Sequence, residues 1–516
     1  MTSSAARTER PAAEEVVGFL EESGVLGADP VRRVDTHAAH VFLAGDRAWK
    51  LKRPVRLDYL DFSTPARRKA ALAAELRLNR RTAPGLYVGL HAITREPDGC
   101  LALDGEGAAV DWLLEMRRFA DDVLLDHRAR RGGLDEGLMI ALADAVHTFH
   151  VAAEIASSSG GAERLGAVIA GNAKSFAAYA GMFDSEAVAK LLARQRAALT
   201  RQSALLDARA RAGRVRHCHG DLHLANIALI DDVPVPFDCL EFDAELATTD
   251  VLYDLAFLLM DLWHRGLRRE ANRLFNRYLD LSAEDEDGVA LMPLLLSIRA
   301  AVRAHVAAAR ARRGGGGAAI RQARSYLALA ASLLDPVPLL LLAIGGRSGT
   351  GKSTLARTLA ADIGAAPGAR ILRSDVVRKR LAGLAPEARI PAADYTAAAS
   401  VRVYAALDSA CRDRLAEGGS VIADAAFLDP RERGAIAEAA ASAGARFVGL
   451  WLEAGLAVRI ARVSGREGDA SDANARVVRL QARRPVGSLR GWRRLAAGGP
   501  PARIAASARR FLARSA

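Results

Sequence analysis

The alternation of hydrophobic and polar residues predicts a small β-sheet crossed by one helix in the first part of the chain. Apolar residues recur at helical spacing in residues 14–26. Residues 1–13 lack an apolar core, and we expect them to form a disordered lead. Residues 44–47 separate two β-like runs and are typical of a hairpin turn. The predicted strands are 41–43, 48–52, 87–93, 101–103 and 110–116, and the predicted helix is 65–81.

The middle of the chain has helical periodicity, interrupted by one β-like island at residues 215–242. Pro336 and Pro338 stop the last of these helices, so residues 335–338 are the best candidate for a linker. We therefore predict one domain over 14–334, with an N-lobe to about residue 118 and a C-lobe over 119–334, and a second domain over 339–516. The predicted helices are 134–155, 165–179, 185–212, 250–265, 270–281, 289–313 and 321–334, with a flexible loop at 314–317.

The second domain opens with the pattern G-x-x-x-x-G-K-[ST], between a buried-strand run at 339–344 and a helix-prone run at 354–360. The glycines let the main chain curl so that its N–H groups point into one concavity at a helix N-terminus, which binds anions. Lys352 would reach the β- and γ-phosphates of a nucleotide, and the Ser353 hydroxyl would ligate Mg²⁺. The motif residues are Gly346, Arg347, Ser348, Gly349, Thr350, Gly351, Lys352 and Ser353.

Two carboxylates and one arginine complete the predicted phosphate site. Asp375 follows the apolar run 371–372, and we predict it to be the general base, with Arg378 binding or orienting the acceptor. The pair Ser374-Asp375 would also cap a helix, and the two readings are compatible. Asp424 ends another apolar strand and is a candidate for the Mg²⁺ shell. Ala425 follows it where a motor ATPase would keep a glutamate, which favours phosphoryl transfer over bulk hydrolysis.

Arg462 and Arg466 lie four residues apart on a predicted helix. This spacing is that of the lid arginines of nucleoside-monophosphate-type kinases, so we predict that both contact nucleotide. Because the chain is rich in arginine, it is an equally good interpretation that either residue is an ordinary solvent-exposed arginine without a ligand. Residues 469–473 are expected to cap a helix that runs to about residue 484.

A second constellation lies in the β-like island. His219, Asp221 and Asn226 have the spacing H-x-D-x-x-x-x-N of a kinase catalytic loop, in which the aspartate takes the acceptor proton and the asparagine holds a metal. Asp238 on the next strand is placed to be a further Mg²⁺ ligand. The alternative is that His219 and Asp221 only cap a turn.

Upstream, the predicted hairpin and helix supply a lysine and a glutamate for a phosphate-holding ion pair. Side chains along a β-strand alternate between its two faces. On the second hairpin strand this places Lys50 and Lys52 on one face and Trp49 on the other. Glu75 lies on the helix that follows. Either lysine fits the role, and a solvated strand face is the alternative for both.

Together these residues resemble the aminoglycoside phosphotransferase family, a branch of the protein-kinase-like fold, over about residues 14–334. The resemblance implies Asp221 as catalytic base, Asn226 and Asp238 as Mg²⁺ ligands and Lys50 as the phosphate-binding lysine, paired with Glu75. Asp254 resembles the aspartate that braces the catalytic loop in that family. The chain departs from the family pattern in two places, since no G-x-G-x-x-G loop precedes the hairpin and Cys239-Leu240 follow Asp238.

The C-terminal domain resembles the small P-loop kinases grouped around gluconate, shikimate and polynucleotide kinases, with residues 374–378 and 469–473 as the closest points of match. The whole chain resembles a bacterial family that joins an aminoglycoside phosphotransferase-like domain to an AAA-type ATP-binding domain. The expected fold is thus an α+β kinase-like bilobal domain followed by an α/β P-loop NTPase domain with a parallel sheet.

Composition narrows the function classes. The chain has 516 residues and a net charge of +12, but the excess of arginine is spread along the sequence and does not by itself indicate nucleic acid. Four cysteines without a C-x-x-C pair predict a reducing compartment and neither disulfides nor a zinc site. The longest apolar runs are far below the roughly 20 residues of a bilayer span, so we expect a cytoplasmic protein without a membrane segment.

These patterns lead to three hypotheses. The first is an ATP- and Mg²⁺-dependent phosphotransferase with two nucleotide sites that acts on a small hydroxylated molecule. The second is a P-loop kinase with a regulatory, pseudokinase-like N-terminal domain. The third is a nucleotide-gated binding protein that signals through its basic surface. The acceptor and the oligomeric state remain open at this stage.

Overall fold

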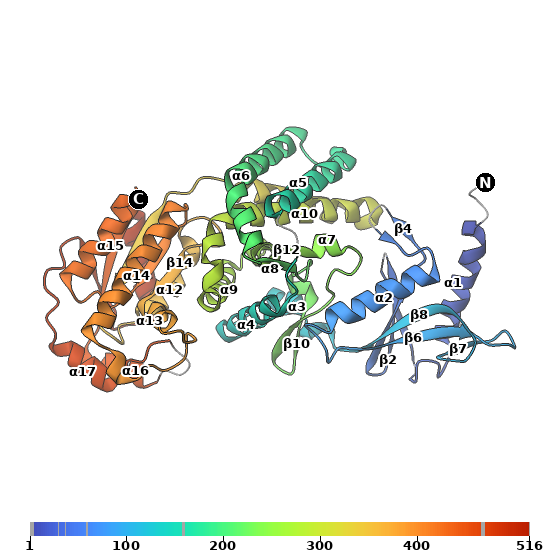
Figure 1. Ribbon diagram of the computed structural model, residues 1–516, viewed down its shortest axis with the longest axis horizontal. Coiled ribbons are helices and arrows are strands. Elements are labelled where there is room, and N and C mark those ends of the chain that lie inside the picture. The colour runs from blue at the N-terminus through green and yellow to red at the C-terminus, as the bar shows by residue number, and fades with distance from the viewer. Residues whose placement is uncertain are drawn as a thin grey trace. The chain divides into compact units, whose positions relative to one another are not determined.

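The computed structural model describes residues 5–28, 30–36, 38–57, 60–156, 160–465 and 470–514. Figure 1 labels helices and strands along the chain. The chain forms two compact units, each made of several separate stretches of sequence. Unit 1 contains residues 1–134, 148–157 and 213–254, and unit 2 contains residues 135–147, 158–212 and 255–516. Helices α4 (Glu136–Ala152) and α8 (Val251–His264) have residues in both units.

Unit 1 is built on a six-stranded antiparallel sheet in the order β1-β2-β3-β8-β6-β7. The alternation predicted for the second hairpin strand is confirmed, because Trp49 packs with Leu20 of α1 (Ala5–Glu21) while Lys50 and Lys52 face Glu75 of α2 (Pro65–Asn79). The strands are β1 (Arg32–Asp35), β2 (Ala39–Ala44), β3 (Arg47–Lys52), β6 (Tyr87–Arg95), β7 (Leu101–Leu103) and β8 (Ala108–Arg117), with the short pair β4 (Arg56–Leu57) and β5 (Leu60–Asp61).

The rest of unit 1 holds the β-like island and is made of short elements. β9 (Val215–His217) pairs with β12 (Thr248–Asp250), and β10 (Ile227–Ile230) pairs with β11 (Val233–Pro236), both antiparallel. A 3-10 turn, η3 (Leu224–Asn226), leads from the predicted catalytic loop into β10. Two short helices, α3 (Leu125–Arg130) and α7 (Ala244–Ala247), complete this part.

The N-terminal helix differs from the expectation. The disordered lead predicted for residues 1–13 is wrong from Ala5 onward, because α1 begins there and ends at Glu21 rather than near residue 26. Val16 and Leu20 are buried in the core of the sheet and anchor the helix at its C-terminal end. The alanines, glutamates and arginines before them have high helix propensity and extend it toward the N-terminus.

The helical part of unit 2 agrees with the predicted elements to within a few residues. The flexible loop predicted at 314–317 is a kinked helical turn, in which Gly314 takes the left-handed φ of 101° that glycine accepts at no steric cost. The helices are α5 (Gly161–Ala178), α6 (Ser185–Arg211), α9 (Arg268–Leu281), α10 (Met292–Arg310) and α11 (Gly316–Ser332), with the 3-10 helix η4 (Ala283–Leu291) and a π-turn at Ala311–Gly315.

One helical run in the described residues passes the length and composition test for a membrane span. It is Ala283–Ser332, and 61% of its most apolar window is buried inside the protein. The helix is interrupted by the kink at Gly314, and buried core helices pass the same test. The run is therefore weak evidence for a span.

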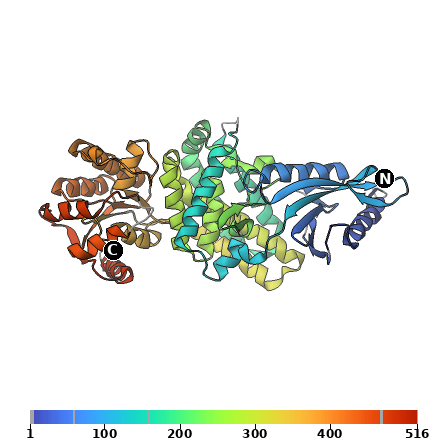
Figure 2. The same ribbon diagram turned by 90° about the horizontal axis from the view of Figure 1, so that it is seen from below.

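The C-terminal part of unit 2 is a five-stranded parallel sheet in the order β14-β15-β13-β16-β17. Helices cover both faces of the sheet (Figure 2). Along β13, Leu342 packs with α12 (Lys352–Leu359) and α18 (Pro501–Arg514), while Leu341 packs with α14 (Ala397–Ala416) and α15 (Pro430–Ser442). The predicted fold class is confirmed in this part as in unit 1. The strands are β13 (Leu340–Gly345), β14 (Arg370–Arg373), β15 (Val421–Asp424), β16 (Arg446–Glu453) and β17 (Trp492–Ala496).

Seven α-helices lie among and beyond these strands in the residues that the structure describes. Two of them, α12 and α13, begin directly after a strand or its loop and so carry the predicted site residues. The helices are α12 (Lys352–Leu359), α13 (Ser374–Leu381), α14 (Ala397–Ala416), α15 (Pro430–Ser442), α16 (Leu456–Ser464), α17 (Ala475–Arg483) and α18 (Pro501–Arg514).

The edge strand β14 is completed by two asparagines of helix α9. Asn276 Oδ1 accepts the N–H of Ile371 at 2.7 Å, and its Nδ2 donates to the carbonyl of Ala369 at 3.2 Å. Asn272 Nδ2 donates to the same carbonyl at 3.1 Å. The two side chains thus supply the donor and acceptor that a sixth strand would offer.

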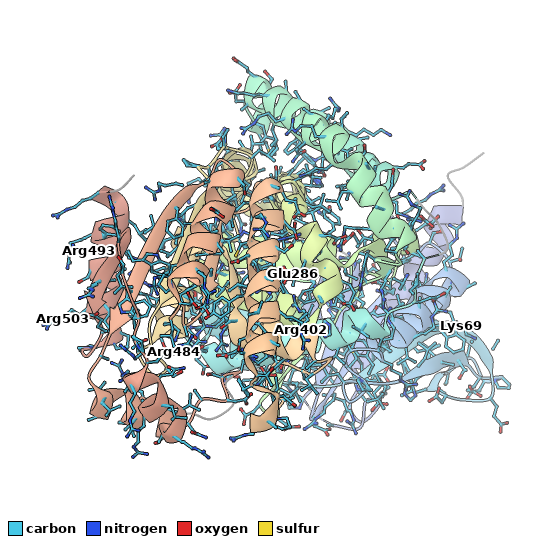
Figure 3. The ribbon with its side chains drawn as sticks, turned by 60° about the vertical axis from the view of Figure 1, so that its left-hand side comes forward. Lys69, Glu286, Arg402, Arg484, Arg493 and Arg503 are labelled. Carbon is cyan, nitrogen blue, oxygen red and sulfur yellow. The ribbon has the colours of Figure 1, made fainter. Side chains whose placement is uncertain are left out.

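A buried ion-pair cluster reinforces this contact. Arg370, 2% exposed, lies 2.7 Å from Glu286 and 2.8 Å from Asp280 (Figure 3 labels Glu286). Burial raises the pKa of Glu286, but Arg370 and Arg380 outweigh it and hold that pKa below its usual value. These contacts lie within unit 2, which contains residues on both sides of the predicted linker, 335–338.

Candidate functional site

The P-loop of unit 2 has the conformation that its sequence predicts. Gly346, Gly349 and Gly351 all have positive φ, of 140°, 83° and 92°. A Cβ at Gly349 would lie 2.5 Å from the carbonyl oxygen of Arg459, so only glycine fits there. Helix α12 begins at Lys352, and the loop therefore ends in a helix N-terminus. Such a turn is a ready-made anion site.

The Ser353 hydroxyl donates a hydrogen bond to Asp424 Oδ2 at 2.5 Å. Asp424 ends β15 and is 4% exposed, and Arg373 Nε lies 3.6 Å from the same carboxylate oxygen. Parallel pairing sets Arg373 opposite Asp424. The two residues predicted as metal ligands in this domain are thus in direct contact.

Asp375 joins the same group from the first turn of α13. Burial raises its pKa, and so does the charge of Asp424. Arg373, Lys352 and a hydrogen bond from Ser471 act in the opposite direction and do not outweigh burial. The structure therefore brings Lys352, Ser353, Asp375 and Asp424 to one place, as the sequence predicts. Arg373 and Ser471 were not among the predicted site residues.

Arg378 lies one turn further along α13. Its guanidinium is 4.7 Å from the centre of the Tyr395 ring, and Nη2 donates to Ser400 Oγ at 3.4 Å. Among the described residues Nη1 is buried without a hydrogen-bond partner. A buried guanidinium nitrogen without a partner is costly, so this geometry suits a ligand with an oxygen acceptor.

The role predicted for Arg462 needs correction. Its Nη1 donates to the carbonyls of Thr350 and Ala497, at 3.3 and 2.8 Å, and its Nη2 donates to that of Gly499 at 3.1 Å. A guanidinium bound by three carbonyls braces the main chain of the P-loop and is not presented to a nucleotide. Arg466, its predicted companion, lies outside the described residues, and α16 ends before it at Ser464.

In unit 1 the structure distinguishes the two candidate lysines. Lys50 Nζ lies 2.6 Å from Glu75 Oε1 and 3.2 Å from Asp238 Oδ1, and its side chain is 17% exposed. Burial lowers the pKa of Lys50, but Asp238 and Glu75 raise it well above its usual value. Lys50 is therefore a cation that connects the helix glutamate with the predicted metal ligand.

Lys52 occupies a more enclosed position. It lies 2.7 Å from the other oxygen of Glu75 and 2.6 Å from Glu241 Oε1, over the ring of Phe62. Its side chain is only 3% exposed. Sequence reasoning missed Glu241, although its place three residues after Asp238 was a usable signal.

The catalytic-loop residues gather beside this network. Asn226 Nδ2 donates to Asp221 Oδ2 at 3.0 Å and to its carbonyl at 3.1 Å, while His223 Nε2 lies 3.4 Å from the same carboxylate. Asp238 takes a left-handed φ of 62°, which aspartate tolerates better than most residues, and its N–H donates to Tyr87 Oη. The predicted set Asp221, Asn226 and Asp238 is thus assembled in one region.

Asp254 braces this loop as the resemblance implies. Its carboxylate accepts the N–H groups of His219 and Gly220, at 3.1 and 2.9 Å. His150 Nε2 lies 3.2 Å from the same group. His150, Cys218 and Asp254 are close enough to hold a metal ion by distance alone. Because the Asp254 oxygens already serve the main chain of the loop, we assign no metal there.

A cavity of about 730 Å³ opens onto these residues within unit 1. Lys50, Asp221 and Asp238 line it together with apolar side chains, a combination typical of a nucleotide site. The apolar lining includes Val41, Leu43, Ala48, Leu86, Met116 and Phe237.

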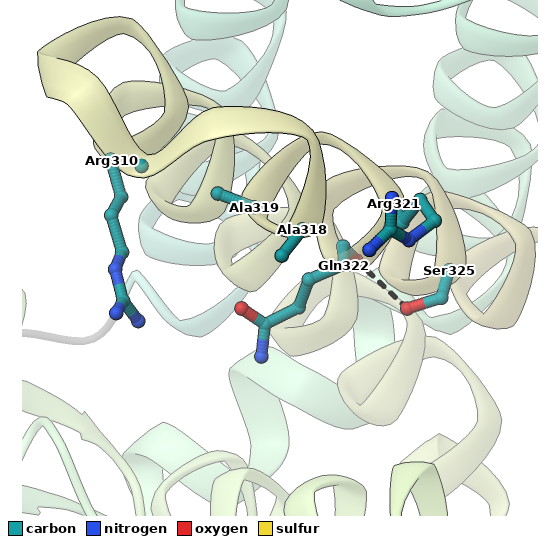
Figure 4. A pocket seen from close by; sticks show the side chains of 7 residues that line it. Arg310, Ala318, Ala319, Arg321, Gln322 and Ser325 are labelled. Atoms are coloured by element: carbon teal, nitrogen blue, oxygen red, sulfur yellow. Dashed lines mark hydrogen bonds between the residues drawn. The ribbon is translucent and has the colours of Figure 1, made fainter.

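Another hollow, of about 490 Å³, lies in unit 2 beside the kink between α10 and α11. Arg310 and Arg321 lie at its sides, and Ser325 donates to the Gln322 carbonyl at 2.8 Å (Figure 4). Both arginines are exposed. The described residues that line the hollow include no carboxylate, so we assign no chemistry to it.

Comparison with known proteins finds a family model and several solved structures that are similar to parts of this chain. Residues 341–485 match the model of a protein family described as AAA domain, which spans the P-loop, Asp375 and Asp424. A gluconokinase structure from Sinorhizobium meliloti 1021 is 21% identical, with a TM-score of 0.26, over 35% of this chain and 94% of that one. A choline/ethanolamine kinase family protein from Mesorhizobium loti is 14% identical, with a TM-score of 0.39, over 63% of this chain and 95% of that one.

The match to a curated relative extends over both units. "Uncharacterized protein Rv2004c" of Mycobacterium tuberculosis (strain ATCC 25618 / H37Rv) is 31% identical over 458 residues, which are 87% of this chain and 89% of the relative. Its counterpart in Mycobacterium bovis, "Uncharacterized protein Mb2027c", matches to the same extent. A likeness of this extent leads to one conclusion: the chain belongs to the family of these mycobacterial proteins.

Proposed function

We propose that this protein is an ATP- and Mg²⁺-dependent phosphotransferase with one nucleotide site in each unit and a hydroxyl group of a small molecule as acceptor. One observation carries the proposal. Each unit gathers a lysine, hard oxygen donors and a carboxylate suited to be a base, the parts that phosphoryl transfer requires. In unit 2 these are Lys352, Ser353, Asp424 and Asp375, and in unit 1 they are Lys50, Asn226, Asp238 and Asp221.

The donor set of unit 2 fits a nucleotide with its metal. The P-loop main chain offers N–H groups at a helix N-terminus, where a Cβ at Gly349 would collide with the main chain. Ser353 and Asp424 offer hydroxyl and carboxylate oxygens, the ligands Mg²⁺ prefers. Lys352 supplies the cation for the phosphates.

The donor set of unit 1 fits as well. The Asn226 amide nitrogen is committed to Asp221, so its oxygen is the atom left to ligate a metal. Asp238 keeps 43% of its side chain exposed, in a cavity that Lys50 also lines. Lys50 would exchange Asp238 for a phosphate oxygen while keeping Glu75.

When bound, MgATP supplies the phosphoryl group and the charge neutralisation that lets an oxygen nucleophile approach it. The chain supplies position and proton acceptance. Asp375 in unit 2 and Asp221 in unit 1 accept the proton of the attacking hydroxyl. Arg378, with its unpartnered nitrogen beside Tyr395, orients the acceptor in unit 2. The proposal also places the reaction in the cytoplasm, where ATP is abundant.

A second candidate keeps catalysis in unit 2 and makes unit 1 a regulatory nucleotide sensor. The turn between β1 and β2 lacks the glycines that cover phosphates in kinases, and this observation favours it. Nucleotide binding to unit 1 without phosphoryl transfer there is its signature.

The test uses the full chain, γ-labelled ATP and a pool of small metabolites as acceptors. Lys352→Ala and Asp221→Ala are compared, singly and together, with Lys190→Ala as an exposed lysine control. We expect each single variant to remove about 10²-fold or more of the transfer to the acceptor of its own unit. If the double variant transfers label as fast as the parent chain, the proposed function is wrong. If only Lys352→Ala matters, the second candidate holds.

A further inference from the structure

The P-loop is tied to the end of helix α17 by three hydrogen bonds. The main-chain N–H of Ser348 donates to Gln481 Oε1 at 2.7 Å. Arg347 Nε donates to the carbonyl of Gln481 at 2.9 Å, and its Nη2 donates to that of Arg484 at 3.0 Å. One of the N–H groups predicted for phosphate binding is therefore held by a glutamine side chain about 130 positions later in the chain, at residue 481.

The other end of the same segment contacts the predicted base. Ser471 hydrogen-bonds Asp375. Asp472 accepts from Tyr395 Oη at 2.7 Å and lies 3.4 Å from Lys379 Nζ. We call residues 470–484 the α17 segment, and its Val478 is fully buried. The segment thus contacts both the P-loop and the neighbourhood of the acceptor.

The orientation of the Gln481 amide follows from its partner. A main-chain N–H only donates, so the side-chain atom that faces Ser348 is the oxygen, and the NH₂ group is directed elsewhere. Ser348 is the third residue of the P-loop and Gln481 is half-buried, so water does not easily replace the contact. A neutral oxygen at this place holds the loop peptide without bringing a charge to a site that binds phosphate.

We propose that Gln481 is a positioning residue of the unit 2 phosphate site: it fixes the Arg347–Ser348 peptide so that the P-loop is formed before nucleotide binds. The inference rests on the proposed function, because it concerns the same site. Pre-organisation lowers the cost of binding, and a loop that must reorder on its own binds phosphate more weakly. Because the α17 segment also holds Asp375 through Ser471, Gln481 links the position of the P-loop to that of the base.

The experiment compares three variants of the full chain. Gln481→Ala removes the acceptor and leaves the main-chain bonds to Arg347. Gln481→Glu keeps an acceptor oxygen but adds a negative charge next to the phosphate site. Leu480→Ala is the matched control, since the Leu480 side chain is 58% exposed on the same helix. All carry Asp238→Ala, so that unit 2 dominates nucleotide binding.

Two quantities are measured for each variant. One is the affinity for a fluorescent ATP analogue with Mg²⁺, and the other is hydrogen exchange of peptides covering 346–351 and 475–484 without nucleotide. For Gln481→Ala we expect about three- to tenfold weaker binding, the loss of one hydrogen bond, with faster exchange in both peptides. For Gln481→Glu we expect the affinity for the ATP analogue to be at least as low as that of Gln481→Ala. The hydrogen exchange of both peptides should stay close to that of the parent chain. Leu480→Ala should change neither.

The decisive result is that Gln481→Glu weakens nucleotide binding while hydrogen exchange of the P-loop stays unchanged. A residue with a merely structural role would not produce this combination. Gln481→Ala with affinity within twofold of the parent and unchanged exchange would overturn the inference. Lys352→Ala separates this failure from that of the proposed function. If the parent binds no nucleotide, or Lys352→Ala binds as well as the parent, the proposed function fails, and the exchange of the 346–351 peptide still decides whether Gln481 positions the loop.

Discussion

The side-chain oxygen of Asn276 accepts the N–H of Ile371 at 2.7 Å, across an interval of 95 residues. Asn276 belongs to helix α9 and Ile371 to the edge strand of the parallel sheet. The strand continues into α13, which carries Asp375 and Arg378. A helix that the sequence assigns to the kinase-like part therefore helps to position the strand that leads to the P-loop site.

The first prediction concerns this contact. Asn276→Leu fills the space but leaves the N–H of Ile371 without its acceptor, at a cost of about 1–3 kcal/mol, while the carbonyl of Ala369 keeps its hydrogen bond from Asn272. We expect a lower free energy of unfolding and faster hydrogen exchange in residues 369–373. Asn276→Asp keeps an acceptor for Ile371 and Arg370 and should lose less.

Arg269→Ala is the control, because Arg269 is exposed on the same helix. It should change the free energy of unfolding by no more than about 0.5 kcal/mol. Slow exchange of residues 369–373 in Asn276→Leu, equal to that of the parent, would show that β14 does not depend on α9.

The second prediction separates the two lysines of unit 1. Lys50→Met should abolish nucleotide binding in unit 1 and destabilise the fold less than Lys52→Met. Both changes remove a partner of the buried Glu75, but the second partner of Lys50, Asp238, is 43% exposed, whereas that of Lys52, Glu241, is 11% exposed. Lys52→Met should destabilise the fold by about 3–5 kcal/mol, because it strips Glu241 and one oxygen of Glu75 of a buried partner.

Binding is measured with the Mg²⁺ complex of a fluorescent ATP analogue in chains that carry Lys352→Ala, and stability by denaturant unfolding. The double change Lys52→Met with Glu241→Gln removes one of the orphaned charges and should recover part of the stability. Equal loss of nucleotide binding in both single variants, at equal stability, would contradict this division of roles.

The third prediction is the dependence of stability on pH. Burial raises the pKa of Glu75, but Lys50 and Lys52 outweigh it and hold the pKa below the usual 4.5. A carboxylate with a lowered folded-state pKa stabilises the fold above its unfolded-state pKa, and this contribution is lost as the pH falls through the folded-state pKa. The stability difference between the parent and Glu75→Gln should therefore be full above about pH 4.5 and shrink at lower pH.

Denaturant unfolding between pH 3 and 7 checks this. Glu14→Gln changes an exposed position and is the control. The difference in free energy of unfolding between the parent and Glu14→Gln should not shrink as the pH falls. A difference between the parent and Glu75→Gln that grows as the pH falls would reverse the sign and refute the ion-pair account.

Several features of this molecule could be predicted from sequence because they are local. The P-loop, the spacing of Asp221 and Asn226, and the period-two placement of Lys50 each depend on a few neighbouring residues and on main-chain geometry. Local patterns also predicted the strands and helices around them, because burial on one face leaves a period in the sequence.

Contacts made by neutral side chains across long intervals could not be predicted. Asn276 at β14 and Gln481 at the P-loop have no periodic or charge signal that marks their partners. The contacts of Arg462 could not be predicted for a related reason, since the sequence does not distinguish an arginine bound to three carbonyls from one that binds phosphate. The sequence patterns also predicted neither the edge strand β17 nor the helix α18, which lie in an arginine-rich part of the chain.

The last prediction tests the metal site of unit 2. Ser353 and Asp424 share a hydrogen bond of 2.5 Å, and both offer oxygen ligands. Ser353→Ala removes one ligand, so half-maximal nucleotide binding should require about tenfold more Mg²⁺. Asp424→Asn should show a larger shift, because it also removes the negative charge that attracts the cation. Thr354→Ala, an exposed hydroxyl next in the chain, is the control.

Binding of the ATP analogue is titrated with Mg²⁺ in chains that carry Asp238→Ala, so that unit 1 does not contribute a metal. A purely structural hydrogen bond between Ser353 and Asp424 predicts something else: both variants would lose stability, and the Mg²⁺ requirement would stay that of the parent. Since Asp424 is buried and ends the strand beside the P-loop strand, both effects are expected together if it ligates the metal. A shift in Mg²⁺ requirement without loss of stability in Ser353→Ala would assign the hydroxyl to the metal alone.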